Sequence, residues 1–108
     1  MLDIKKNVED DKITLQLKGR LDTTTADNLQ EIVNDLPEVK TLIFDFKELD
    51  YISSAGLRIL LQLQKQMMDK GEMIVENCNS SVLEVFEITG FKDFLTIRWW
   101  AIAHFSFG

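Results

Sequence analysis

The stretch DFKELDYISSAGLRILLQLQKQM, residues 45–67, decides the fold of this chain. It begins inside an apolar run, residues 41–46, which is typical of a central strand covered on both faces. After a polar connection, apolar residues recur at helical spacing from Ser54 to Met68. Gly71 follows as the expected C-terminal cap of that helix. A buried strand that leads into an amphipathic helix predicts an α/β fold.

The N-terminal part predicts a β-hairpin followed by a helix. Apolar and polar residues alternate through residues 2–17 on both sides of a polar turn, and Gly19 is expected to break the second strand. Helical spacing returns over residues 24–36. Thr24 and Asp27 are placed as a capping pair for this helix.

The C-terminal part predicts one more helix between two strands. Residues 72–76 are rich in apolar side chains and read as a strand. Ser81 and Glu84 fit a capping box that opens a short helix ending at Gly90. Apolar residues over 94–97 suggest a last strand. The order β-β-α-β-α-β-α-β predicts a mainly parallel or mixed sheet flanked by α-helices.

Composition bounds the class of protein. The chain has 108 residues, enough for a single domain over residues 1–108, and its net charge is −6, which argues against a nucleic-acid binder. One cysteine and one histidine exclude an internal disulfide and the usual structural zinc site, and no cofactor motif occurs. No apolar run is long enough for a membrane span and no secretory signal is present, so we expect a cytoplasmic protein.

Two serines stand at the start of the central helix. Backbone N–H groups and the helix dipole favour a phosphate at Ser53 or Ser54, although serine is also a common N-cap. Gly56 lies in the first turn, where glycine costs about 1 kcal/mol relative to alanine. Its role is either close packing of helix on sheet or access for another protein to the serines.

Four stretches resemble the STAS domain of anti-sigma factor antagonists. They are GRLD at residues 19–22, FDF at 44–46, YISSAGL at 51–57 and GF at 90–91, and the resemblance covers residues 1 to about 97. It implies a STAS-like fold and a regulatory binding module with no catalysis of its own.

The resemblance also implies a phosphorylation switch. Ser54 would be the phosphoacceptor, modified by an anti-sigma factor that is also a serine kinase, and Asp22 would lie beside it. The unmodified protein would bind that factor, phosphorylation would abolish binding, and a serine phosphatase would restore it. The implied partner-binding residues are Asp22, Ser53, Ser54, Ala55, Gly56 and Leu57.

Two features depart from the family pattern. Many members carry aspartate where this chain has Ser53, which removes one charge and leaves two adjacent hydroxyls, so Ser53 is the alternative acceptor to Ser54. Residues 98–108 contain two tryptophans and two phenylalanines. This tail is either an amphipathic helix that packs on the sheet or a surface for self-association.

Other functions receive weaker support from the residues. The same domain could serve as a regulatory subunit of a lipid-transport or stress-signalling complex. A serine hydrolase would need a base, yet His104 is the one histidine and no G-x-S-x-G elbow occurs. Cys78 is either a thiol of lowered pKa or a small buried residue. Asp45 and Asp50 could form a carboxylate pair for a metal or remain solvated.

Overall fold

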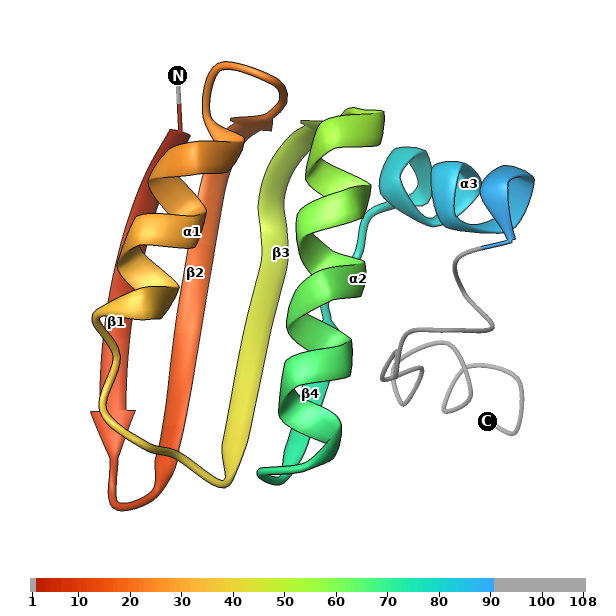
Figure 1. Cartoon of the computed structure of the whole chain (residues 1–108). Coiled ribbons are helices and arrows are strands. Elements are labelled where there is room, and N and C mark those ends of the chain that lie inside the picture. Colours follow the sequence, from red (N-terminus) through yellow and green to blue (C-terminus); the bar gives the residue numbers. More distant parts are fainter. Residues whose placement is uncertain (1, 91–108) are drawn as a thin grey trace, which may run out of the picture.

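The computed structural model describes residues 2–90, and these form one four-stranded sheet with three helices. The elements are β1 (Leu2–Glu9), β2 (Lys12–Leu21), α1 (Ala26–Asn34), β3 (Thr41–Ile52), α2 (Ser54–Met68), β4 (Glu72–Glu76) and α3 (Ser80–Thr89) (Figure 1). The predicted last strand over 94–97 and the aromatic tail over 98–108 lie outside the described residues.

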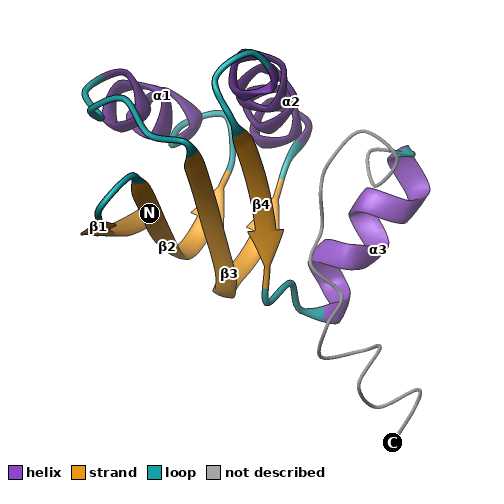
Figure 2. Cartoon of the chain, turned by 90° about the horizontal axis from the view of Figure 1, so that it is seen from below, coloured by secondary structure: helices purple, strands orange, loops and turns teal. Residues whose placement is uncertain are grey.

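The sheet is mixed, as the sequence predicts. Its strand order is β1-β2-β3-β4, with β1 antiparallel to β2 and both other pairs parallel. Figure 2 shows α1 and α2 together on one face of the sheet, while α3 lies beside β4. In this arrangement the carboxyl ends of β2 and β3 lie side by side at one edge of the sheet. From there the chain continues into α1 after β2 and into α2 after β3.

The core lies between the sheet and the helices, and it follows from the apolar periodicity. Phe44 and Phe46 are fully buried on β3, with ring centroids 5.9 Å apart, and Ile43, which precedes them and faces the other side of the sheet, is only 5% exposed. The continuous apolar run is therefore buried on both faces, as predicted. The helices contribute Leu29, Leu57, Leu60, Leu63, Met67, Val82 and Phe86 to the core.

The strands β2 and β3 extend further than the sequence patterns predict. Gly19 does not end β2: it adopts a φ of 109° where the pairing register shifts before Arg20, and the strand continues to Leu21. Opposite it, the supposed polar connection after Phe46 is strand as far as Ile52, because it pairs with this extension. Each strand is thereby carried to the edge where the candidate site lies.

The ends of α2 and α3 correct two further predictions. Asn79, not Ser81, caps α3: its side chain accepts a hydrogen bond from the Val82 N–H at 3.0 Å. Gly71 is not a left-handed cap. A Cβ there would lie 1.9 Å from the carbonyl oxygen of Lys40, so Gly71 is required by close approach of two backbones.

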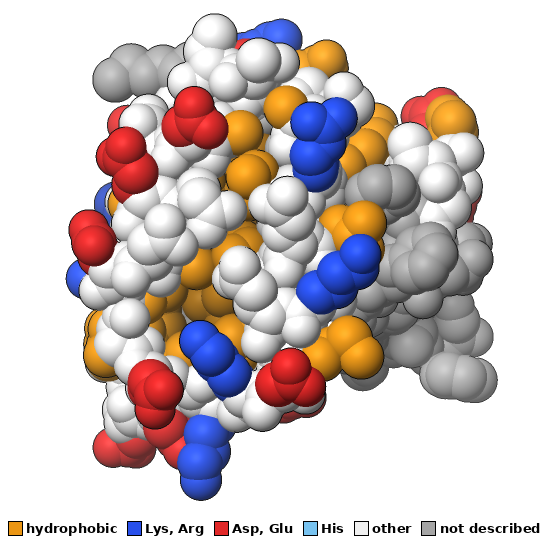
Figure 3. Space-filling model, viewed as in Figure 1, with side chains coloured by type: hydrophobic (Ala, Val, Ile, Leu, Met, Phe, Trp, Pro, Cys, Tyr) orange, Lys and Arg blue, Asp and Glu red, His pale blue; other side chains and the backbone are white. Residues whose placement is uncertain are grey.

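Figure 3 shows hydrophobic side chains gathered in a hollow between α1 and α2. This hollow has a volume of about 180 Å³ and is lined by Val33, Leu36, Val39, Leu42, Leu63 and Met67, among others. Met67 is in the last turn of α2, about 20 Å along the helix axis from Ser54. The hollow is therefore separate from the serine pair.

Candidate functional site

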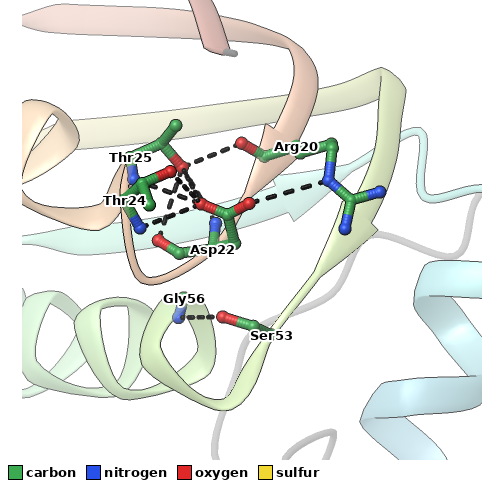
Figure 4. Close-up of polar contacts among 6 residues, drawn as sticks. All are labelled: Arg20, Asp22, Thr24, Thr25, Ser53 and Gly56. Atoms are coloured by element: carbon green, nitrogen blue, oxygen red, sulfur yellow. Dashed lines mark hydrogen bonds and ion pairs between the residues drawn. The ribbon is translucent and has the colours of Figure 1, made fainter.

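The two serines have different structural roles. Ser53 is the N-cap of α2: it is half-buried, its backbone is extended, and its Oγ accepts a hydrogen bond from the Gly56 N–H at 3.4 Å (Figure 4). Ser54 is the first residue of the helix and is exposed. Its hydroxyl makes no hydrogen bond within the described part of the chain. One hydroxyl thus stabilises the helix start, and the adjacent one is free for chemistry.

Asp22 organises the loop that follows β2. Its Oδ1 accepts hydrogen bonds from the Thr24 N–H at 3.0 Å, the Thr24 hydroxyl at 2.7 Å and the Thr25 N–H at 3.3 Å. The Thr24 hydroxyl bond, followed by the backbone N–H bond of Thr24, lowers the pKa of Asp22 from its ordinary value, against the opposing effect of desolvation. The predicted Thr24 and Asp27 capping pair is replaced by this arrangement, and the N-cap of α1 is Thr25 without a side-chain cap bond.

Thr25 connects this loop to the end of β2. It is 5% exposed, and its Oγ1 accepts a hydrogen bond from the Asp22 N–H and donates one to the Arg20 carbonyl, both at 2.8 Å. Thr25 is not among the site residues that the sequence predicts. An aspartate followed by threonines is typical of a turn in which the aspartate side chain accepts a hydrogen bond from the backbone N–H two residues later. Residues 22–25 carry this pattern.

The Asp22 loop should make stability depend on pH, and Asp22→Asn tests this. Because the folded pKa lies below the unfolded value, the carboxylate stabilises the fold above the unfolded pKa, and this contribution is lost as pH falls through the folded pKa. We expect the variant to unfold at lower denaturant concentration than the wild type at neutral pH, with the difference shrinking in acid. Asp50→Asn, at an exposed position of β3, is the control. A difference that persists unchanged in acid would contradict the assignment.

A backbone contact joins the Asp22 loop to the serine pair. The Ser53 N–H donates a hydrogen bond to the Leu21 carbonyl at 2.9 Å, so the residue before Asp22 touches the residue before Ser54. This contact places Asp22 and Ser54 at the same edge of the sheet. The register of β2 on β3, with Leu21 opposite Ile52, produces it.

Gly56 is a packing residue. A Cβ at this position would lie 2.8 Å from Leu21 Cγ, 2.9 Å from Ile52 Cγ1 and 2.9 Å from the Leu21 carbonyl oxygen. The interpretation that Gly56 provides access for a partner is therefore wrong, because the missing side chain faces the sheet. Glycine lets the first turn of α2 approach the end of β2.

The six residues named from the sequence divide by exposure. Ser54 is exposed, while Asp22, Ser53 and Ala55 are half-buried. Gly56 and Leu57 are buried, Leu57 with 4% of its surface exposed. The side chain of Leu57 packs in the core, whereas the four residues Asp22, Ser53, Ser54 and Ala55 keep surface exposed to solvent at this edge.

Arg20 and Tyr51 add a second feature, which the sequence patterns do not predict. The Arg20 Nε lies 3.6 Å from Asp22 Oδ2, and its guanidinium carbon lies 4.3 Å from the centroid of the Tyr51 ring. Tyr51 is 42% exposed, so the outer face of its ring remains accessible to solvent. The two residues are register partners on neighbouring strands, and no local pattern in the sequence pairs them.

The structure bears on two weaker candidates, Cys78 and the pair Asp45 and Asp50. Burial, with a smaller effect from Asp45, raises the pKa of the Cys78 thiol to about 12, so this cysteine is not an activated nucleophile. Asp45 accepts hydrogen bonds from the Lys47 N–H and the Asn77 side chain. Among residues 2–90, no cluster of histidine, cysteine and carboxylate side chains is arranged to hold a metal.

Within the same residues, no helix is both long and apolar enough to cross a bilayer.

Known proteins with similar sequences and structures support one family. The model of the STAS domain matches residues 3–100. BtrV of Bordetella bronchiseptica, assigned as an anti-sigma factor antagonist, is 37% identical over 78 residues, which cover 69% of this chain and 67% of BtrV. The anti-sigma-B factor antagonist of Bacillus subtilis is 30% identical over 98 residues, covering 89% of this chain and 88% of that protein.

The fold is also that of a solved antagonist. The unphosphorylated form of the anti-sigma factor antagonist SpoIIAA superposes with a TM-score of 0.74 at 20% identity, over 91% of this chain and 88% of that one. SpoIIAA from Bacillus in its phosphorylated form superposes with a TM-score of 0.68 at 18% identity, over the whole of both chains. Because the family model spans most of its length and the fold agrees, this chain belongs to the STAS domain family.

Proposed function

We propose that this chain is a cytoplasmic anti-sigma factor antagonist that is switched by phosphorylation of Ser54. In the unphosphorylated form it binds an anti-sigma factor with serine kinase activity. The kinase transfers the γ-phosphoryl group of ATP to Ser54 Oγ: a new P–O bond forms, the bond to ADP breaks, and the hydroxyl proton leaves to a base of the kinase. A serine phosphatase hydrolyses the ester and restores binding.

The observation that carries the proposal is that Ser53 caps α2 whereas Ser54 is exposed. The Ser53 hydroxyl accepts a bond from the Gly56 N–H and is half-buried, whereas the Ser54 hydroxyl is exposed at the first position of α2. A kinase must reach the acceptor oxygen from solvent, and only Ser54 offers that access without breaking a helix cap. This favours Ser54 over the alternative acceptor Ser53.

The start of α2 can stabilise a phosphate on Ser54, and the added charge explains why the phosphorylated form would not bind the partner. Unpaired N–H groups in the first turn can hydrogen-bond phosphate oxygens, and the helix dipole favours the added anion. The phosphate brings a charge of about −1.5 to −2 to a chain whose net charge is −6. A partner surface that fits a neutral hydroxyl would have to desolvate this charge, and binding would be lost.

Phosphotransfer with mass spectrometry tests the proposal. Incubated with ATP and a co-encoded serine kinase, the protein should gain one phosphate on Ser54, and with ATP alone it should gain none. Ser54→Ala should bind the kinase but accept no phosphate. Ser53→Ala should still be modified, although loss of its cap costs about 1 kcal/mol of helix stability.

Two outcomes would contradict the proposal at different levels. Phosphate on Ser53 instead of Ser54 would move the acceptor by one residue and leave the switch intact. Failure of every co-encoded kinase to modify either serine would replace the switch by the alternative, a regulatory subunit of a transport or stress-signalling complex.

A further inference from the structure

Arg58 lies one helical turn beyond Ser54 on α2. Residues four apart on an α-helix are neighbours on its surface, with Cβ atoms about 5–6 Å apart. Both Ser54 and Arg58 are exposed. A group attached to the Ser54 hydroxyl would therefore project within reach of the long Arg58 side chain.

Arg58 has no anionic partner of its own. The sequence of α2, SAGLRILLQLQKQMM, contains no acidic residue, and the positions three and four residues from Arg58 are Ser54, Ala55, Leu61 and Gln62. No ion pair of Arg58 occurs within residues 2–90. On this helix, the one position at which an anion could meet Arg58 is thus a phosphorylated Ser54.

The second arginine at this edge is already engaged. Arg20 pairs with the Asp22 carboxylate at 3.6 Å and stacks on the Tyr51 ring at 4.3 Å. Asp22 in turn is occupied by Arg20 and by the threonines of its loop. The other charged side chain on this end of β3, Asp50, is exposed. Of the two arginines in residues 2–90, Arg58 is the one that a new phosphate can pair with without breaking an existing ion pair.

We propose that Arg58 is the intramolecular counter-ion of phosphorylated Ser54. This inference rests on the proposed phosphorylation of Ser54, and it identifies the side chain that pairs with the phosphate in the modified protein. The order is favourable, because an anion placed N-terminal to a cation at this spacing also agrees with the helix dipole. The planar guanidinium can donate two parallel N–H bonds to phosphate oxygens, which a lysine cannot match.

The pair changes the surface in two ways at once. Before phosphorylation, Arg58 projects into solvent beside the hydroxyl that the partner must approach. After phosphorylation, its guanidinium is drawn to the phosphate, so the partner meets a new anion and also loses an available cation. Arg58 thereby adds to the contrast between the two states.

The second ionisation of the phosphate, followed by ³¹P NMR, tests the pairing. Phosphoserine is installed at position 54 during translation, so that the test does not depend on any kinase. Free phosphoserine has a second pKa of about 6, and a paired guanidinium favours the dianion. We expect that pKa to be lower by about half a unit in the wild type than in Arg58→Gln, with Arg58→Lys in between.

Two variants serve as controls. Lys65→Gln removes the same charge from an exposed position further along α2 and should leave the phosphate pKa close to the wild-type value. Arg20→Gln removes the rival arginine and should also leave it nearly unchanged. Thermal unfolding should be the same for Arg58→Gln as for the wild type, because the exposed side chain makes no ion pair to lose.

Three results would overturn the inference. They are a phosphate pKa in Arg58→Gln equal to that of the wild type, an equal shift in Lys65→Gln, or a larger shift in Arg20→Gln. Because the phosphate is installed directly, these results concern Arg58 alone. Absence of kinase-catalysed transfer to Ser54 concerns the proposed function instead.

Discussion

Ser54→Asp should fold as the wild-type chain does and lose its partner. The new carboxylate stands in the first turn of α2, where the helix dipole favours a negative charge, so the free energy of unfolding should change by less than about 1 kcal/mol. In a complex formed around a neutral hydroxyl, the same charge must be desolvated against a partner surface that offers it no counter-ion, with Arg58 as the one cation four residues along the helix. That costs about 3 kcal/mol or more, which lowers affinity for the anti-sigma factor about a hundredfold.

A matched control is available on α3. Ser80 is also an exposed first helical residue, directly after the Asn79 cap, so Ser80→Asp adds the same charge at the same position of a different helix. Affinity measured by calorimetry should fall for Ser54→Asp and not for Ser80→Asp. If Ser54→Asp binds as tightly as the wild type, the switch at Ser54 is refuted.

Gly56→Val should unfold far more easily than the wild type. The first added carbon already lies 2.8 to 2.9 Å from Leu21 Cγ, Ile52 Cγ1 and the Leu21 carbonyl oxygen. The carbonyl belongs to the backbone of β2 and cannot rotate away as a side chain could. We expect the free energy of unfolding to fall by about 3 kcal/mol, at the upper end of what overpacking usually costs.

Chemical denaturation measures this effect, with Gln62→Val as the control. Gln62 is exposed on the same helix, so this substitution introduces the same β-branched side chain without the steric conflict and should cost only a few tenths of a kcal/mol. Gly56→Ala should fall between the two, because its single carbon meets the same atoms but gains helix propensity. A stable Gly56→Val that has lost only partner binding would revive the access interpretation.

Elements with a strong local pattern could be predicted from the sequence. The bounds of α2 and β4, at 54–68 and 72–76, agree with the structure because the apolar period of each is unbroken over its whole length. The N-terminal hairpin and the mixed character of the sheet were also predictable, since they follow from alternation and element order.

The ends of strands and helices that depend on contacts with residues far away in the sequence could not be predicted. The polar residues after Phe46 form strand because they pair with the extension of β2 beyond Gly19. Likewise, Asn79 caps α3 in place of Ser81 while its side-chain amide donates a hydrogen bond to the Leu49 carbonyl at 2.6 Å. Both results come from contacts some thirty residues apart in the sequence, which a local pattern does not contain.

The sequence by itself determined that two serines stand at the candidate site, because the strand-to-helix pattern around YISSAGL places them at a helix start. The tertiary structure decided what each residue does there. Packing of α2 against Leu21 makes Gly56 a spacer, capping engages the Ser53 hydroxyl, and exposure leaves Ser54 accessible. The register of β2 on β3 places Arg20 over Tyr51 and beside Asp22. These roles depend on distances between separate segments, and folding alone brings those segments together.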